Sequence, residues 1–215
     1  MPPDHKSIED LRAIDSKCVR CSLCKFPPLV TVESAQFSSA CPSYHEYKLH
    51  SHSGGGRVVM ALSVGEGRAE VTDEARDAFF QCTLCGACDI ACKYSSDIEI
   101  LEMLYALRAE SFRRVGPLPG HQRILERLDD VGHPRSESGK KGDWLRDMGR
   151  EAGAKGRETL LWVGDHYALH LDARKSLMNL VRLLEAAGVA FGALGDEEPS
   201  TARVALDIGD LERFD

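Results

Sequence analysis

The sequence lacks the segments and motifs that mark several common classes of protein. No apolar run approaches the roughly eighteen residues that a membrane-spanning helix needs, so any membrane contact is expected to come through a partner. The opening segment Met1–Lys17 is polar and charged, unlike the apolar centre of a secretory signal, and we expect a cytoplasmic location. No G-x-G-x-x-G follows the first predicted strand, and no G-x-x-x-x-G-K-[ST] occurs anywhere. Neither a dinucleotide site nor a nucleoside triphosphate site is therefore indicated.

Basic charge is also scarce. The chain has 27 Lys and Arg against 34 Asp and Glu, a net charge of −7, which argues against a role in binding nucleic acid. With 215 residues and 43% hydrophobic content, it can form one or two globular domains. The mildly basic middle segment Arg108–Glu158 and the acidic segment Asp196–Asp215 are candidate docking surfaces, although solvated faces are the commoner explanation.

All the cysteines lie in the first part of the chain, in two sets. The first set is Cys18-x2-Cys21-x2-Cys24 followed by Cys41, and the second is Cys82-x2-Cys85-x2-Cys88-x3-Cys92. Three thiolates at C-x2-C-x2-C spacing can reach three corners of a cubane iron-sulfur cluster, and a more distant cysteine supplies the fourth ligand. In two-cluster ferredoxins, the fourth cysteine of each run ligates the other cluster. On this basis one 4Fe-4S cluster is held by Cys18, Cys21, Cys24 and Cys92, and the other by Cys82, Cys85, Cys88 and Cys41.

Two other uses of the cysteines remain as alternatives. Structural zinc prefers paired C-x2-4-C knuckles separated by a longer loop, and neither set here is a simple pair. A disulfide framework belongs to small secreted domains, which the polar start of the chain does not suggest. Two departures from the ferredoxin pattern stand against the clusters: the long spacing from Cys24 to Cys41, and Lys93 where a proline usually follows Cys92.

Apolar periodicity predicts helices around both cysteine sets. The predicted helices before Cys82 are Ser7–Ser16, Arg57–Val64 and Asp73–Gln81. His45, His50 and His52 flank a glycine run at irregular spacing, and we expect solvated loop residues rather than metal ligands.

After Cys92, two more helices are predicted, and then a change of pattern. Ser96-x-x-Glu99 is expected to form a capping box for a helix that ends at Arg114, before Gly116 and Pro117. The next helix is expected at His121–Val131, ending at Gly132.

Three regions follow from this pattern. Residues 1–135 are predicted to form the cluster-binding domain, residues 136–158 a linker, and residues 159–215 a small α/β segment. In that segment, a strand at Leu160–Val163, a helix at Asp172–Ala187 and a strand at Val189–Phe191 make a βαβ unit. Asp172 is the expected N-cap, Gly188 the expected stop, and Val204–Leu206 could add a third strand.

The cysteine segment Cys82–Cys88, the Leu- and Arg-rich helix after it and the segment Leu160–Gly164 resemble iron-sulfur subunits related to heterodisulfide reductase. Relatives in that group include the iron-sulfur subunits of anaerobic glycerol-3-phosphate dehydrogenase, glycolate oxidase and class II benzoyl-CoA reductase complexes. The resemblance implies a mainly α fold, an alpha-helical ferredoxin domain with two 4Fe-4S clusters. In larger members a cysteine-rich repeat called CCG follows. Here its key places correspond to Gly164-Asp165 and Glu197–Ser200, which hold no cysteine.

The expected function is therefore electron transfer. The resemblance implies a subunit that passes single electrons between a flavoprotein and a catalytic subunit of a hetero-oligomeric oxidoreductase complex, with no catalytic residues of its own. The first alternative is an enzyme subunit that shares an active site with a partner for disulfide or CoA-thioester reduction, near Asp165, His166, Tyr167 and His170. His166 and His170 would share a face if helical, but a loop with a packing or surface role is expected there. The second alternative is a zinc-stabilised scaffold without redox chemistry.

Overall fold

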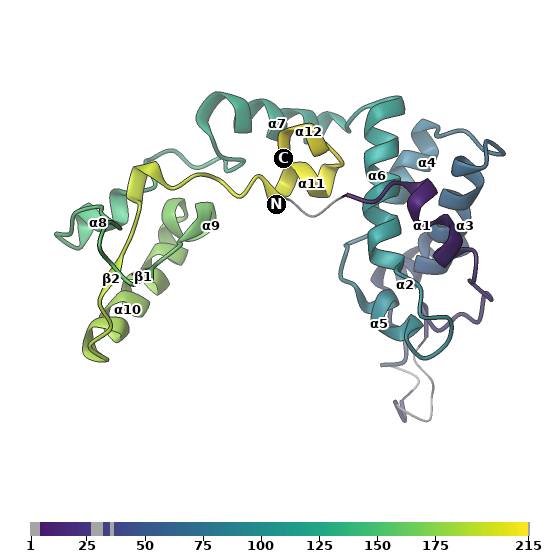
Figure 1. Cartoon of the computed structure of the whole chain (residues 1–215), viewed down its shortest axis with the longest axis horizontal. Coiled ribbons are helices and arrows are strands. Elements are labelled where there is room, and N and C mark those ends of the chain that lie inside the picture. The colour runs from purple at the N-terminus through teal and green to yellow at the C-terminus, as the bar shows by residue number, and fades with distance from the viewer. Residues whose placement is uncertain (1–4, 27–31, 35–36, 215) are drawn as a thin grey trace. The chain divides into compact units, whose positions relative to one another are not determined.

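The computed structural model describes residues 5–26, 32–34 and 37–214 (Figure 1). The chain is mainly helical, as predicted, and divides into two compact units. Unit 1 comprises the chain up to Pro117 together with the segment from Ala205, and unit 2 comprises Leu118–Val204. This division differs from the predicted one, because the helix that begins at Pro119 belongs to unit 2 and the end of the chain belongs to unit 1.

Unit 1 is a bundle of helices around one apolar core. Its elements are α1 (Ile8–Asp15), α2 (Pro42–Tyr47), the 3-10 helix η1 (His50–His52), α3 (Gly54–Gly65), α4 (Asp73–Phe80), α5 (Ala87–Cys92), α6 (Ile100–Val115), α11 (Arg203–Ile208, which begins at the boundary) and α12 (Leu211–Phe214). Helices α3 and α6 pack on each other and on α1, and α4 packs on α6 (Figure 1). Leu11, Val58, Met103 and Leu107 are fully buried between them, and the buried cysteines Cys24, Cys88 and Cys92 belong to the same core. The cysteine loops are thus anchored on the packed helices.

Local capping explains the helix starts before the second cysteine set. The Ser7 hydroxyl accepts a hydrogen bond from the Asp10 backbone N–H at 3.2 Å, and the Asp10 carboxylate accepts one from the Ser7 N–H at 2.8 Å, a capping box that confirms the first predicted helix. Helix α4 begins at Asp73, as predicted, and the Thr72 side chain caps it. Helix α3 starts at Gly54, three residues before the predicted position, because Ser53 caps it by accepting from the Gly56 N–H at 3.1 Å.

The predicted capping box at Ser96 and Glu99 is wrong. Glu99 is itself the N-cap of α6 and makes no side-chain capping bond. Asp97 has a positive φ of 47°, so the backbone turns there and Ser96 does not continue the direction of the helix. The free N–H of Leu101 instead donates to the Asp89 carboxylate on α5, at 3.1 Å. A contact between two helices therefore replaces the local box. The far end of α6 is as predicted, since Gly116 with φ of 77° terminates it.

Unit 2 has a smaller core around a minimal parallel sheet. Its elements are α7 (Pro119–Val131), α8 (Asp143–Asp147), β1 (Thr159–Leu160), α9 (Gly164–Leu169), α10 (Leu171–Ala186), β2 (Phe191–Gly192) and the 3-10 helix η2 (Gly195–Glu197). Strands β1 and β2 are parallel, with Thr159 opposite Phe191. Each has two residues and is shorter than the predicted strand, and α9 and α10 come between them in the chain.

The predicted linker contains a structured element. Within residues 136–158, helix α8 buries Trp144 and Leu145 against Leu169 and Val181, so this region is part of a core and not only a connection. The Gly-, Ser- and Lys-rich composition concealed it, because only two apolar residues mark the short helix.

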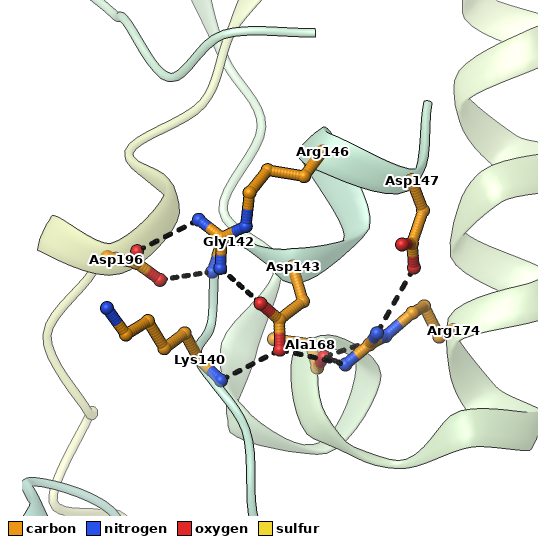
Figure 2. A network of polar contacts seen from close by, with 8 residues as sticks. All are labelled: Lys140, Gly142, Asp143, Arg146, Asp147, Ala168, Arg174 and Asp196. Atoms are coloured by element: carbon orange, nitrogen blue, oxygen red, sulfur yellow. Dashed lines mark hydrogen bonds and ion pairs between the residues drawn. The ribbon is translucent and has the colours of Figure 1, made fainter. Parts of the chain in front are cut away.

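A polar network fixes α8 to its neighbours (Figure 2). Asp196 accepts from the Gly142 backbone N–H at 2.7 Å and pairs with Arg146 at 3.2 Å. Arg174 donates to the Ala168 carbonyl at 2.8 Å and pairs with Asp147 at 3.2 Å (Figure 2). These bonds tie α8 to η2 on one side and to α9 and α10 on the other, and they are structural.

Two further predictions in the C-terminal region are wrong. Val204–Leu206 lies in helix α11, where Ala205, Leu206 and Ile208 are buried at helical spacing, and is not a strand. The N-cap of α10 is His170 rather than Asp172, because the His170 ring Nδ1 accepts from the Ala173 N–H at 3.4 Å. The predicted stop at Gly188 is correct, with φ of 71° just after the helix.

Candidate iron-sulfur centres

The eight cysteines surround two separate cavities in unit 1. The first cavity is lined by Cys18, Cys21, Cys24 and Cys92, and the second by Cys41, Cys82, Cys85 and Cys88. Their empty volumes are similar, about 360 and 340 Å³. This is the crossed grouping predicted from the spacing, and it differs from the grouping by sequence order. Among the described residues, no three His, Cys, Asp or Glu side chains converge on a point suited to a single metal ion.

Two adjacent glycines at the start of α3 separate the cavities. A Cβ on Gly54 would lie 2.6 Å from the Cβ of Cys88 and 2.9 Å from its Sγ, whereas a Cβ on Gly55 would lie 3.2 Å from the Sγ of Cys24. Neighbouring residues therefore touch cysteines of different cavities. The positive end of the α3 dipole also points toward both thiol groups, where it favours negative charge. The sequence reading took this Gly run only as a turn, although its place between the two cysteine sets was a usable signal.

Backbone N–H groups point at several of the sulfurs. The Gly55 N–H donates to Cys24 Sγ at 3.3 Å, the Leu84 N–H to Cys82 Sγ at 3.4 Å, and the Tyr44 N–H to Cys41 Sγ at 3.4 Å. Such hydrogen bonds are among the factors that set the reduction potential of iron-sulfur clusters.

The cysteine loops adopt backbone conformations that turn the chain sharply. Arg20, Ser22 and Leu84 have positive φ values of 56°, 70° and 52°, which are unusual for residues with side chains. Each is next to a cysteine or within two residues of one. Left-handed residues of this kind let a short loop present its side chains and its N–H groups to a compact anionic group.

The buried thiols are crowded. Burial raises the pKa of the Cys88 thiol to about 12, and the neighbouring thiols of Cys82 and Cys24 add to the rise. Burial also raises the pKa of Cys24, while the hydrogen bond from Gly55 opposes that rise. Thiols in this environment stay protonated until they bind a metal centre. Binding of a cluster therefore releases their protons. The donor set and the glycine cradle fit 4Fe-4S clusters.

Arg57 is fully buried beside the second cavity. It donates to the carbonyls of Ala78 at 2.7 Å and His52 at 2.6 Å, and to the Ser43 hydroxyl at 2.9 Å. No carboxylate pairs with it among the described residues. Burial lowers the pKa of Arg57, and the thiols of Cys82, Cys41 and Cys88, which line this cavity, oppose that shift. A buried guanidinium is costly unless an anion compensates it, and the thiolates of the second cavity are the anions at hand.

Arg108 is a second buried cation on the same side. Its guanidinium donates to the carbonyls of Cys82 and Asp207, both at 2.6 Å, and lies 4.7 Å from the ring centroid of Phe80. Burial lowers the pKa of Arg108, and Cys82 is the first of the groups that oppose that shift. The sequence reading missed Arg57 and Arg108. The signal in the sequence was a single Arg among the apolar positions of a predicted helix. The same pattern is common on protein surfaces, so it does not by itself indicate a buried Arg.

The histidines that flank the glycine run differ from one another. His45 and His50 are exposed, as expected, but the expectation is wrong for His52, which is 8% exposed. The His52 Nε2 lies 2.5 Å from the Gln81 Oε1, and its ring packs 4.4 Å from that of Tyr47. The role of His52 is therefore to join η1 to the end of α4.

The histidines of the alternative shared active site have structural positions. His166 and the residues beside it form α9 rather than the expected loop, and the His166 and His170 rings lie 5.3 Å apart. His170 caps α10.

The two segments that correspond to the cysteine positions of the CCG repeat do meet in unit 2. The Ser200 hydroxyl donates to the Asp165 carboxylate at 2.7 Å, and Lys141 pairs with the same carboxylate. The Glu198 carboxylate accepts from the backbone N–H groups of Val163 and Gly164 at 2.9 and 2.6 Å. A hydrogen-bonded polar cluster thus occupies this position.

Comparisons with known proteins agree with the chemistry of the cavities. The family described as "4Fe-4S dicluster domain" matches residues 15–96, a span that contains all eight cysteines and is less than half of the chain. A curated relative from Chromohalobacter salexigens, named "Probable membrane-anchored ferredoxin", is 29% identical over 153 residues, which is 69% of this chain. The chain spans only 22% of that relative's length. No solved structure matches the chain.

These findings identify an iron-sulfur protein. The chain carries 4Fe-4S clusters, and the description of the matched domain implies two of them. Both matches also support a role in electron transfer. Within the described part of the chain, no helix has the length and apolar character needed to span a bilayer.

Proposed function

We propose that the chain is an electron-transfer subunit that relays single electrons through two 4Fe-4S clusters, one in each cavity. Cys18, Cys21, Cys24 and Cys92 ligate the first cluster, and Cys41, Cys82, Cys85 and Cys88 ligate the second. The clusters supply the one-electron chemistry. The protein supplies thiolates, N–H donors to sulfur and a surrounding that excludes water.

The single observation that carries this proposal is the position of Gly54 and Gly55. These adjacent residues touch Cys88 of the second cavity and Cys24 of the first, so only a short piece of backbone separates the two groups of thiols. A relay needs two centres held close together and fixed, and a helix N-terminus packed between them meets both requirements. A zinc-stabilised scaffold has no need for this proximity.

Solvent access supports a path through the chain. Each cavity has one exposed cysteine, Cys21 in the first and Cys85 in the second, whereas Cys24, Cys88 and Cys92 are buried. Of the buried cysteines, Cys88 lies against Gly54 and Cys24 against Gly55, the two glycines that we name the glycine divider. The side chain of Ile100 would lie 3.1 Å from a Cβ on Gly54. An electron can therefore enter near one exposed cysteine and leave near the other.

The partners follow from what the described chain does not offer. It has no dinucleotide or phosphate-loop motif, so we infer that electrons reach the clusters from another protein or another domain. On the resemblance to heterodisulfide reductase-related subunits, the donor is a flavoprotein and the acceptor is the catalytic subunit of an oxidoreductase complex. The membrane-anchored relative offers a second setting, in which the ferredoxin part belongs to a longer protein. A cytoplasmic location stays a prediction.

Metal analysis and redox titration test the proposal. Anaerobically purified chain is expected to contain iron and acid-labile sulfide in equal amounts, about four of each per cavity. Paramagnetic resonance during a redox titration is expected to show two reducible centres, and Cys21→Ser and Cys85→Ser assign them. Stoichiometric zinc without visible absorption would contradict the proposal. So would turnover of a disulfide or thioester substrate by the isolated chain at the rate of the intact complex.

A further inference from the structure

Exposed apolar side chains in unit 1 gather beside the cysteines. Among its described residues, every large hydrophobic side chain that is exposed lies within residues 19–49 or 90–94. Val19, between Cys18 and Cys21, is 69% exposed, and Phe26, two residues after Cys24, is 42% exposed. Apolar groups in water are unfavourable, and a concentration of them beside functional residues marks a surface that another molecule covers.

Unpaired positive charge gathers in the same stretch. Four described cations of unit 1 are neither buried nor paired with a carboxylate: Lys17, Arg20, Lys25 and Lys48. The other cations of this unit form ion pairs with Asp or Glu, or are the buried Arg57 and Arg108. Residues 17–50 contain only Glu33 and Glu46 as acids. In a chain with a net charge of −7, this stretch is locally basic.

These side chains lie in or directly beside the first cysteine loop. Val19 lines the first cavity together with Cys21, Lys17 directly precedes Cys18, and Lys25 and Phe26 directly follow Cys24. Arg20 lines the first cavity, and His50, which also lines it, has its pKa lowered by burial and then by the charges of Lys25 and Arg20. The Lys25 ammonium lies 5.0 Å from the ring centroid of Tyr44, and the Phe26 ring meets the same ring edge-on at 5.3 Å. We name Lys17, Val19, Arg20, Lys25 and Phe26 the Cys21 rim.

We propose that the Cys21 rim is the docking surface for an acidic one-electron carrier protein. This proposal rests on the proposed function and adds to it the partner's charge and the cluster at which that partner docks. The carrier's acidic side chains meet the cations of the rim, and its apolar centre covers Val19 and Phe26. Docking here places the carrier against exposed Cys21. The step moves one electron between the carrier and the chain, transfers no atom and forms no bond.

Among the described residues, no exposed cation lines the second cavity, whereas the exposed Arg20 lines the first. The exposed cysteine of the second cavity, Cys85, lies between Leu84 and Gly86, and the two cations near that cavity, Arg57 and Arg108, are buried. The part of the basic middle segment that lies in unit 1 is also a weaker candidate, because its exposed cations Arg113 and Arg114 pair with Glu110. Unpaired exposed cations beside a cluster are what steers an acidic carrier, since the field of ion-paired charges largely cancels.

The test uses the full chain with its clusters loaded. The rim variant is Lys17→Gln, Arg20→Gln, Lys25→Gln, and the control variant is Lys6→Gln, Arg68→Gln, Arg113→Gln, which removes the same charge from exposed, ion-paired positions of unit 1. Stopped-flow absorption follows electron transfer from an acidic flavodoxin in its hydroquinone form, at low and high salt. Redox titration of each protein checks that the cluster potentials are equal.

The expected results separate steering from other effects. The wild-type rate constant for electron transfer is expected to fall as the salt concentration rises. At low salt the rate constant of the rim variant is expected to be about tenfold lower or more, and nearly independent of salt. The control variant is expected to have the rate constant and the salt dependence of the wild type. If the rim variant does not load clusters, the single variant Lys17→Gln is used in its place, because Lys17 lies outside the cysteine loop. Its salt dependence is expected to be weaker than that of the wild type, by less than in the triple variant.

Three outcomes would overturn the docking proposal. The first is a rim variant whose rate constant and salt dependence equal those of the wild type. The second is a wild-type chain that reacts faster at low salt with a basic carrier, such as cytochrome c, than with the acidic flavodoxin. The third is a rim variant that no longer binds phosphatidylserine vesicles but reacts with the carrier at the wild-type rate. The last would assign the rim to a membrane surface. If dithionite reduces the clusters but no carrier protein does at any salt concentration, the proposed function itself fails.

Discussion

The two cysteine cavities are alike in size and in their four thiols, but their positive charges are placed differently. Arg20, which lines the first cavity, and Lys17, next to Cys18, are exposed, and Lys25, next to Cys24, is half-buried without a carboxylate partner. Around the second cavity, Arg57 and Arg108 are buried. Exposed charges act at a distance and are screened by salt, whereas buried charges act on the nearest group and are screened little. The first cavity is therefore suited to receiving a partner, and the second to stabilising an added electron.

The largest effects are expected at the glycine divider. Gly54→Ala places a Cβ 2.6 Å from the Cβ of Cys88, so the second cavity must deform and its cluster is expected to be lost or much reduced. Gly55→Ala meets Cys24 Sγ at 3.2 Å, and a milder loss confined to the first cluster is expected. Iron content and the paramagnetic signal of each cluster measure both effects.

A glycine in an open site provides the control for this pair. Gly120 is helical, and the nearest atom to an added Cβ is the end of the Arg123 side chain at 3.9 Å. Gly120→Ala is expected to leave both clusters intact and to stabilise α7 by up to about 1 kcal/mol. Full cluster loading in Gly54→Ala would show that the packing against Cys88 is not as tight as described.

The next effect concerns the potential of the second cluster. Arg57→Gln removes a buried positive charge, which makes reduction of the second cluster less favourable. The reduction potential of that cluster is expected to fall by about 60 mV or more, about 1.4 kcal/mol per electron. The first cluster has no comparable buried cation among the described residues that line its cavity, and its potential is expected to stay nearly the same. A redox titration followed by paramagnetic resonance reads both in one sample.

Arg76→Gln is the matched control for that measurement. Arg76 is also largely shielded, but it pairs with Asp73 on the surface of α4. Its removal is expected to leave both potentials unchanged. Equal shifts of both clusters in Arg57→Gln would mean that this guanidinium acts through the general fold rather than on the second cavity.

The effect that touches the clusters least concerns a buried acid on the side of the first cavity, because it changes stability and not loading or potential. Asp15 is fully buried, and its carbonyl accepts from the Cys18 N–H at 3.1 Å. Burial raises the pKa of its carboxyl to about 7; the backbone of Glu99 opposes that rise, and the charges of Glu99 and Asp89 add to it. The folded state then holds this proton more tightly than the unfolded state, in which the carboxyl has its ordinary pKa of 3.8. Stability is therefore lost as the pH rises from about 4 through 7 and is constant above that.

Asp15→Asn removes this dependence. Relative to wild type, the variant is expected to gain about 1–3 kcal/mol at pH 8 and clearly less at pH 5.5, because Asn needs no ionisation in the buried site. Anaerobic urea denaturation of the loaded protein at both pH values measures it. The opposite trend, with a variant that is less stable at pH 8 than at pH 5.5 relative to wild type, would contradict the assignment.

Local signals in the sequence predicted a large part of this structure. The caps at Ser7, Gly132 and Gly188 each act through contacts within a few residues, and the helices that they bound were found in place. The crossed grouping of the cysteines was expected from two-cluster ferredoxins, and the same groups line the two cavities. That these groups ligate clusters stays a prediction.

The features that sequence reading missed depend on contacts between distant segments. Gly54 is close to Cys88 only when α3 and α5 are packed, and Arg108 reaches Asp207 from the far end of the chain. Helix α8 exists because Trp144 finds a core made by α9 and α10. No local pattern encodes such partners, and the same property led to the wrong strand at Val204–Leu206.

The crossed arrangement of the two cavities is the central claim, and Cys92→Ser tests it most directly. After Cys21→Ser and Cys85→Ser have assigned the two paramagnetic signals, the reduced Cys92→Ser protein is measured under the same conditions. Cys92 lines the first cavity, so the signal assigned through Cys21 is expected to be lost or altered, and the signal assigned through Cys85 is expected to be unchanged. Loss of the Cys85-linked signal with an intact Cys21-linked signal would show that each motif closes its own cluster, and it would contradict this account.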